Sequence, residues 1–140
     1  PHHFLSVTKA GGTAIVATRG NPDSHVILRG GAQPNFDAAS VSAAAGVLQA
    51  QGRRAALMID ASHANSGKDP LRQPAVLESV IEQRLAGDSS LRGVMLESHL
   101  FDGCQALSGE LRYGVSVTDG CLGWSGTEAA LRQAAERLRG

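Results

Sequence analysis

The sequence predicts an α/β fold in which short parallel strands alternate with helices, and three observations support this. Three apolar runs after residue 24 are too short for helices, and segments with apolar residues at helical spacing separate them. Each run ends in a cluster of polar residues. Because strands joined by helical crossovers run parallel, the three polar clusters are expected at one edge of the sheet.

Residues 1–20 are expected to form a β-hairpin. Phe4–Val7 and Thr13–Ala17 are β-prone runs, and the glycine-containing gap Lys9–Gly12 lies between them. A gap of this length and composition is typical of a hairpin turn. The sequence therefore predicts a small antiparallel ribbon ahead of the parallel strands.

The three apolar runs are predicted to form the strands of one sheet, at His25–Leu28, Ala55–Ile59 and Gly93–Leu96. A short continuous apolar run is typical of a strand that is buried on both faces. We therefore expect His25–Leu28 to be covered on both sides.

Two helices are predicted between these strands. The first covers about residues 37–51, with Asn35 or Asp37 as its N-cap, and ends at Gly52. The second covers about residues 71–86, where apolar residues recur at helical spacing.

A last helix is predicted after a long loop. Ser125 and Glu128 match the S-x-x-E capping box that marks a helix start. The apolar residues that follow at helical spacing are Leu131, Ala134, Ala135 and Leu138. The chain is thus expected to end in a helix capped by Ser125.

Three strands are too few to close a barrel, and so small a sheet leaves apolar edges unpaired. We interpret residues 24–140 as the last three β/α units of a TIM (β/α)8 barrel, with an open α/β sheet as the alternative. All 140 residues are assigned to one domain. Since the chain starts at Pro1 without an initiator methionine, we expect it to be the later part of something longer.

Composition argues against several functional classes. The 13 basic and 13 acidic side chains cancel, so no basic footprint for nucleic acid is present. No apolar stretch approaches the roughly 18 to 20 residues that span a bilayer, and no signal peptide is recognisable, so a cytoplasmic protein without membrane contact is expected. Cys104 and Cys121 form no C-x-x-C pair and are expected to be free thiols.

Polar residues that follow the predicted strands are candidates for a metal site. His63 and Glu97 follow the second and third strands, and Asp119 lies in the loop after the third. An imidazole and two carboxylates suit a divalent metal of intermediate hardness such as Mn²⁺, Fe²⁺ or Zn²⁺. The alternative is that the carboxylates are solvated loop residues and that His63 caps its loop.

Arg29 directly precedes Gly30 and Gly31 at the end of the first predicted strand. A guanidinium forks onto phosphate or carboxylate, and glycines let a ligand approach the backbone, so an anion site is predicted. A salt bridge beside an ordinary glycine turn is the alternative.

Other chemically distinctive residues are given structural roles. We expect His99 to cap the turn that follows it, and Cys104 and Cys121 to be idle thiols rather than ligands. Tyr113 and Trp124 are single aromatic residues and are expected to pack against other residues.

Five ordered motifs carry a resemblance to a known family. They are F-L-S-V-T-K from Phe4, H-V-I-L-R-G-G from His25, M-I-D-A-S-H-A-N-S from Met58, G-V-M-L-E-S-H-L from Gly93 and Y-G-V-S-V-T-D-G-C-L-G-W from Tyr113. Over essentially its whole length, the chain resembles the C-terminal part of type I 3-deoxy-D-arabino-heptulosonate 7-phosphate (DAHP) synthases, the microbial first enzyme of the shikimate pathway.

The resemblance implies a TIM barrel that condenses phosphoenolpyruvate with erythrose 4-phosphate and water to DAHP and phosphate, using a divalent Mn, Fe, Co or Zn ion. His63, Glu97 and Asp119 fall on three of the family's metal ligands. Arg29 falls on a ligand of the phosphoenolpyruvate phosphate. The fourth metal ligand is a cysteine of the N-terminal half, which no residue here matches.

The resemblance also implies regulation and assembly. Phe4 and Ser6 match positions that line the pocket for an aromatic amino-acid inhibitor, although Phe4 is equally expected to pack the ribbon onto the barrel. A homo-oligomer, dimer or tetramer, is expected, and the isolated chain should have no turnover. The alternatives are 3-deoxy-octulosonate 8-phosphate synthase, which the I-L-R-G-G and hairpin segments argue against, and a non-catalytic domain that senses aromatic amino acids.

Overall fold

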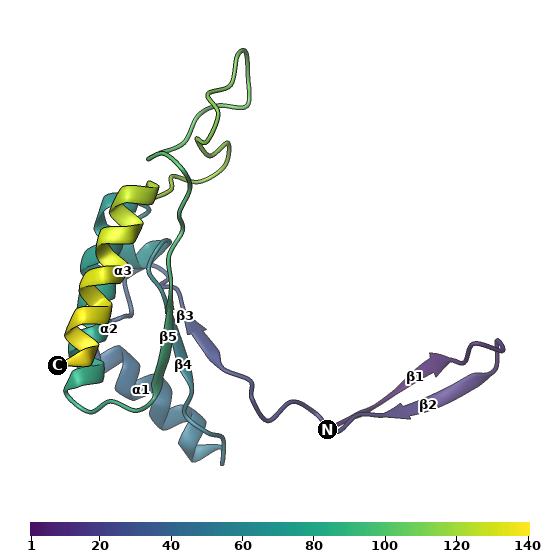
Figure 1. Ribbon diagram of the computed structural model, residues 1–140. Coiled ribbons are helices and arrows are strands. Elements are labelled where there is room, and N and C mark those ends of the chain that lie inside the picture. The colour runs from purple at the N-terminus through teal and green to yellow at the C-terminus, as the bar shows by residue number, and fades with distance from the viewer.

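A computed structural model describes all 140 residues and shows an α/β chain in two parts, a β-hairpin and a parallel sheet with helices (Figure 1). The strands are β1 His3–Val7, β2 Thr13–Ala17, β3 Val26–Leu28, β4 Leu57–Asp60 and β5 Leu91–Met95. The helices are α1 Ala38–Ala50, α2 Gln73–Leu85 and α3 Trp124–Arg139, with short 3₁₀ turns at Ala64–Ser66 and Pro70–Arg72.

The hairpin prediction is confirmed. Strands β1 and β2 pair antiparallel, with Phe4 opposite Val16 and Ser6 opposite Ala14. The turn is closed by the Thr8 N–H, which donates to the Gly12 carbonyl over 2.9 Å. Figure 1 shows that this ribbon projects away from the rest of the molecule.

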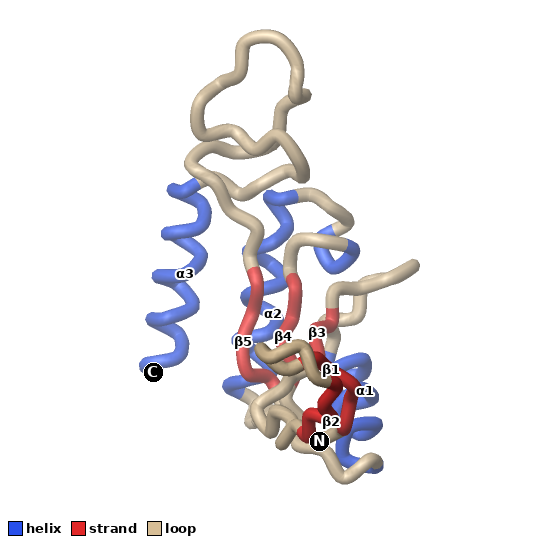
Figure 2. Tube along the Cα trace, turned by 90° about the vertical axis from the view of Figure 1, so that its right-hand side faces the viewer, coloured by secondary structure: helices blue, strands red, loops and turns tan.

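The parallel arrangement is also confirmed. The sheet has the order β3-β4-β5, and both neighbouring pairs run parallel (Figure 2). The sheet is open, and a closed barrel is not part of this structure. The carboxyl ends of all three strands therefore point to the same edge, as the crossover argument requires.

The prediction that His25–Leu28 is buried on both faces is wrong. Val26 is 39% and Ile27 43% exposed, although both are apolar. The reason is that β3 lies at the edge of the sheet and pairs only with β4. The central strand β4 is the one that is buried, as Leu57 and Ile59 are fully covered.

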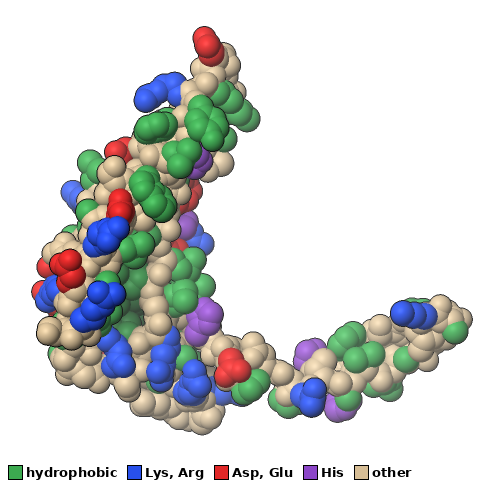
Figure 3. Space-filling view, viewed as in Figure 1, with side chains coloured by type: hydrophobic (Ala, Val, Ile, Leu, Met, Phe, Trp, Pro, Cys, Tyr) green, Lys and Arg blue, Asp and Glu red, His purple; other side chains and the backbone are tan.

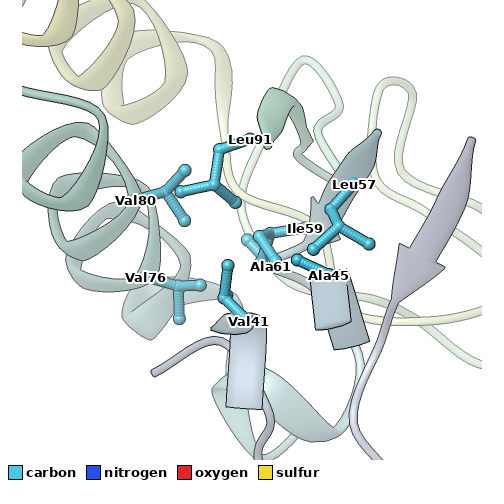
Figure 4. Close-up of a cluster of buried hydrophobic side chains, with 8 residues drawn as sticks. All are labelled: Val41, Ala45, Leu57, Ile59, Ala61, Val76, Val80 and Leu91. Atoms are coloured by element: carbon cyan, nitrogen blue, oxygen red, sulfur yellow. The ribbon is translucent and has the colours of Figure 1, made fainter. Parts of the chain in front are cut away.

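The core lies between the sheet and its helices (Figure 4). Its eight buried residues are Val41, Ala45, Leu57, Ile59, Ala61, Val76, Val80 and Leu91. A second cluster joins α2 to α3 through Leu77, Ile81, Ala130 and Ala134. These contacts hold the helices against the strands whose ends carry the polar residues.

Helix starts agree with the sequence in one case and differ in two. Asp37 caps α1, as its carboxylate accepts the Ser40 N–H over 3.0 Å. Helix α2 starts at Gln73 rather than near residue 71, because Asp69 first caps the 3₁₀ turn Pro70–Arg72. The capping box predicted for α3 is wrong, because its N-cap is Gly123.

In α3 the two residues of the predicted box lie inside the helix. Glu128 instead accepts a hydrogen bond from Arg132, one turn further on, over 2.7 Å. The S-x-x-E pattern here thus marks an exposed ion pair of the kind that stabilises helix surfaces rather than a helix boundary.

The expectation that the two single aromatics pack against other residues is wrong. Trp124 is 61% and Tyr113 85% exposed. Figure 3 shows hydrophobic side chains gathered on the surface of the long loop and along the hairpin.

No helix of the chain is both long and apolar enough to span a bilayer.

Candidate metal and anion site

The three predicted metal ligands line one pocket at the carboxyl ends of the parallel strands. His63 follows β4, Glu97 follows β5, and Asp119 lies in the loop that leads to α3. The other lining residues are Ser62, Lys68 and Gly120. As the side chains stand, no three His, Cys, Asp or Glu residues are grouped tightly enough to hold a metal ion. The donors thus face a shared space without closing on a common point.

The orientation of His63 is fixed by Asp60, the last residue of β4. The His63 Nδ1 lies 2.7 Å from the Asp60 Oδ2, and the Asp60 carboxylate also accepts the Ser62 N–H over 2.9 Å and the Ser62 hydroxyl over 2.7 Å. Because an ionised carboxylate only accepts hydrogen bonds, the Nδ1 of His63 carries the proton. The lone pair of Nε2 is therefore left for another partner.

Asp60 is only 3% exposed, yet it stays ionised. Burial raises the pKa of Asp60, but the hydrogen bonds from Ser62 and His63 together outweigh burial and hold this pKa below its ordinary value. Sequence reasoning did not single out Asp60 as a functional residue. Its position three residues before His63 at a strand end is the signal that could have identified it.

Glu97 and the loop that carries Asp119 are joined through the backbone. The Leu122 N–H donates to the Glu97 carbonyl over 2.9 Å, and the His99 N–H donates to the Leu122 carbonyl over 2.9 Å. Asp119 itself is exposed. These bonds bring a segment more than twenty residues away to the end of β5.

Lys68 is a member of the pocket that the sequence did not indicate. It is the one residue other than glycine with a positive φ, 63°, and its N–H donates to the His63 carbonyl over 2.9 Å. It forms no ion pair. Lys68 thus adds a cationic side chain to a pocket that Glu97 and Asp119 also line.

Arg29 lies at the end of β3 and is exposed, but it does not line the pocket of His63. It forms no ion pair, so the salt bridge weighed as an alternative is not found. Gly30 has φ +74°, and a Cβ there would lie 2.7 Å from the Ala64 Cβ. This glycine therefore permits close contact between the Arg29 segment and the loop of His63.

Asn65 ties the ends of β3 and β4 together. Its side-chain amide donates to the Leu28 carbonyl over 3.0 Å and to the Asp60 carbonyl over 2.8 Å. Its Oδ1 accepts the Asn35 N–H over 2.8 Å. Asn65 is buried, so these bonds fix the spacing between the strand ends that carry Arg29 and His63.

The candidate effector residues lie far from this pocket. Phe4 and Ser6 are on β1 of the projecting ribbon (Figure 1). The Phe4 ring lies 5.7 Å, centroid to centroid, from the ring of His2 in the same hairpin. Packing of the ribbon onto a barrel through Phe4 stays a prediction, because the closed barrel is not part of this structure.

His99, Cys104 and Cys121 do not line the pocket of His63. The Nδ1 of His99 lies 2.5 Å from the Gly114 carbonyl oxygen, and because a carbonyl oxygen only accepts, Nδ1 donates this hydrogen bond and ties the segment after β5 to the long loop. Cys104 is an exposed and Cys121 a buried free thiol. Burial raises the pKa of Cys121, which keeps it in the thiol form.

Residues 1–132 match the model of the DAHP synthetase I family. The chain belongs to this family. It is 46% identical over 143 residues to the Tyr-sensitive phospho-2-dehydro-3-deoxyheptonate aldolase of Escherichia coli K12, covering 100% of this chain and 40% of that protein. It is 50% identical over 141 residues to the Phe-sensitive enzyme of the same strain, covering 99% and 40%.

A solved structure of the family has the same fold over nearly the whole chain. The phospho-2-dehydro-3-deoxyheptonate aldolase of Francisella tularensis SCHU S4 superposes with a TM-score of 0.88 at 45% identity, covering 99% of this chain and 41% of that one. The family resemblance of the sequence motifs is therefore confirmed. The chain spans about 40% of the length of the relatives it matches.

Proposed function

We propose that this chain supplies the metal-binding edge of a DAHP synthase, which condenses phosphoenolpyruvate with erythrose 4-phosphate and water to DAHP and phosphate in the shikimate pathway. The observation that carries the proposal is that His63, Glu97 and Asp119 line one pocket beyond β4 and β5 in a chain of the DAHP synthetase I family.

The donors in the pocket fit a divalent Mn, Fe, Co or Zn ion. Asp60 holds the Nδ1 proton of His63, which is the arrangement that presents Nε2 to a metal. Glu97 and Asp119 add carboxylate oxygens. Three protein ligands leave room for a fourth ligand from outside this chain and for substrate. When bound, the metal supplies a Lewis acid that polarises the aldehyde oxygen of erythrose 4-phosphate.

Arg29 is proposed to bind the phosphate of phosphoenolpyruvate. Its guanidinium is free of ion pairs and follows a strand that ends at the same sheet edge as His63 and Glu97. Phosphoenolpyruvate carries a phosphate and a carboxylate, so one guanidinium neutralises only part of its charge. The other cations of the substrate site are proposed to come from residues outside this chain.

Residues 24–140 are proposed to be the last three β/α units of a TIM (β/α)8 barrel. The open sheet supports this, because β3 and β5 each pair on one side only and keep apolar residues such as Val26, Ile27 and Met95 exposed. A chain that holds only part of the barrel lacks most of the substrate cations. The isolated chain is therefore proposed to be inactive.

The hairpin is proposed to take part in feedback inhibition by an aromatic amino acid, with Phe4 and Ser6 in the inhibitor pocket. The names of two E. coli relatives, Tyr-sensitive and Phe-sensitive, support this for the family. The ribbon exposes Leu5 and Ile15 on a projecting arm, which suits contact with another subunit of a homo-oligomer. We also propose that the protein acts in the cytoplasm.

A chimera tests the function. The matched region of the E. coli Tyr-sensitive relative is replaced by residues 1–140, and consumption of phosphoenolpyruvate is followed with erythrose 4-phosphate or arabinose 5-phosphate. We expect turnover with erythrose 4-phosphate, its loss on chelation and its return with a divalent metal. Glu97→Gln in the chimera should abolish turnover, and the chain alone should show none.

Two results would contradict the proposal. A folded chimera that consumes no phosphoenolpyruvate would remove the synthase assignment. A chimera that remains active after chelation, or with Glu97→Gln, would remove the metal site.

A further inference from the structure

Gln73 is a polar residue with no exposed surface, located at the first position of α2. Its side-chain amide forms two hydrogen bonds, both with the backbone of Glu97. The Nε2 donates to the Glu97 carbonyl over 3.0 Å, and the Oε1 accepts the Glu97 N–H over 2.8 Å. The Nε2 and the Oε1 of this buried amide thus both form hydrogen bonds with a single residue, which lies 24 positions away in the sequence.

This amide replaces a strand neighbour that the sheet no longer provides. The ladder between β4 and β5 ends where Asp60 pairs with Met95 and the Ala61 N–H donates to the Met95 carbonyl over 2.9 Å. Beyond this point the chain after β4 turns into the loop of His63. Glu97 would then have an unpaired N–H on that side, and an unpaired backbone group away from water is costly.

The loop that carries Asp119 also bonds to the Glu97 backbone. The Leu122 N–H donates to the same Glu97 carbonyl that accepts from Gln73. The backbone of Glu97 is therefore held by two segments, through Gln73 of α2 and through Leu122. Loss of the Gln73 amide would leave the Glu97 N–H unpaired and its carbonyl with Leu122 as the remaining donor.

We propose that Gln73 is a positioning residue, which sets the place of the Glu97 carboxylate relative to His63 and Asp119 through paired hydrogen bonds to the Glu97 backbone. The inference rests on the proposed metal site. A partner that orients a metal ligand typically changes metal affinity by about 10- to 100-fold when it is removed. The side chain of Gln73 is expected to have an effect of this size without touching the metal or the substrates.

The experiment titrates Co²⁺ into the 140-residue chain and follows the visible absorption of the bound ion. Gln73→Met keeps the length of the side chain and removes both hydrogen bonds. The matched control is Gln83→Met on the same helix, because the Gln83 amide also donates to a distant backbone carbonyl, that of Phe36, over 2.9 Å. Thermal unfolding of both variants is measured in parallel.

We expect Gln73→Met to bind Co²⁺ about 10- to 100-fold more weakly and with an altered spectrum, whereas Gln83→Met binds as the unmodified chain does. Both variants should unfold at lower temperature. If Gln73 only stabilises the fold, the two variants will lose thermal stability and keep the same Co²⁺ affinity, and the proposal is wrong.

Two further results are decisive. If Gln73→Met does not fold, amide hydrogen exchange of the unmodified chain serves instead. The Glu97 N–H should then be as protected as the amides of β5, and exchange at the rate of an exposed loop would overturn the proposal. Co²⁺ is titrated in the same way into the chimera with the E. coli relative, and if neither the unmodified chain nor the chimera binds it, both the metal site and the inference fail. Equal binding by the unmodified chain and a folded Gln73→Met contradicts the inference alone.

Discussion

Replacement of Asp60 by asparagine removes one buried negative charge and leaves the size of the side chain unchanged. The asparagine carbonyl can still accept the two hydrogen bonds from Ser62. The new amide NH₂ group, however, would face the protonated Nδ1 of His63, which lies 2.7 Å from the carboxylate in the unmodified chain. Two donors cannot share this contact, so the His63 proton is expected to move to Nε2.

The magnitude follows from the contacts that are lost. A hydrogen bond to a charged group contributes about 1.5–3 kcal/mol. An unfolding entropy of about 2.1 cal/mol/K per residue gives roughly 0.3 kcal/mol/K for a chain of 140 residues. The thermal midpoint of Asp60→Asn should therefore fall by about 5–10 °C. With the proton on Nε2, Co²⁺ affinity should fall by about 10- to 100-fold.

The assay combines thermal unfolding, Co²⁺ titration and the ¹⁵N shifts of the imidazole, which report the tautomer. Asp88→Asn is the matched control, because Asp88 accepts the Ser90 N–H over 2.8 Å and the Ser90 hydroxyl over 2.6 Å in the same turn geometry without a histidine. It should retain full Co²⁺ affinity. A folded Asp60→Asn with an unchanged tautomer and unchanged Co²⁺ affinity would refute the reasoning.

Three further predictions concern other parts of the chain. Lys68→Gly should raise the thermal midpoint by about 3 °C, because a left-handed backbone costs an ordinary residue about 1 kcal/mol; an unchanged midpoint would contradict this. Hydrogen bonds from the Ser40 hydroxyl and amide lower the pKa of Asp37, so its contribution to stability is present above the ordinary pKa and is lost as the pH falls through the lowered value. Asp37→Ala should therefore lower the midpoint more at neutral pH than in strong acid, where a protonated Asp37 still caps the helix but no longer carries a charge; an equal loss at both pH values would contradict this. Iodoacetamide should modify the exposed Cys104 in the folded chain. Cys121 should react only on unfolding, because it is buried and burial raises its pKa. Equal rates for the two thiols in the native chain would refute this.

The parts of the fold that the sequence predicted depend on neighbours in the chain. The hairpin follows from two β-prone runs on either side of glycines, and the cap of α1 follows from Asp37 three residues before Ser40. The parallel sheet follows from strands that alternate with helices. In each case the interacting groups, or the rule that orders them, can be identified from spacing alone.

The parts that the sequence did not predict depend on which segments cover which. A continuous apolar run predicted that β3 is buried, but burial requires a second neighbouring strand, which β3 does not have. Trp124 was expected to pack because it is aromatic, yet no element lies over its position at the start of α3. The start of α3 was misplaced because Gly123 caps it without a side chain.

The candidate site likewise contains residues that the sequence identified and residues that it did not. His63, Glu97 and Asp119 were identified because each is a polar residue beyond a strand, and the structure places them around one pocket. Asp60 and Gln73 were not identified, because a buried polar residue is recognised only by its partners. The Asp60 partner is three residues away, whereas the Gln73 partner lies in another β/α unit.

An irregularity in the pairing of β4 with β5 determines where Glu97 lies along the sheet relative to this pocket. Leu57 pairs with Leu91, but Met58 pairs with Gly93, so β5 contains one extra residue, Arg92, between these pairs. Because side chains alternate along a strand, one extra residue exchanges the faces of everything that follows it. Without Arg92 as an extra residue, Glu97 would lie one position further along the sheet relative to β4. The opposite side of its backbone would then face Gln73. The register of β4 and β5, rather than the identity of the ligands alone, therefore decides whether the carboxylate can join His63.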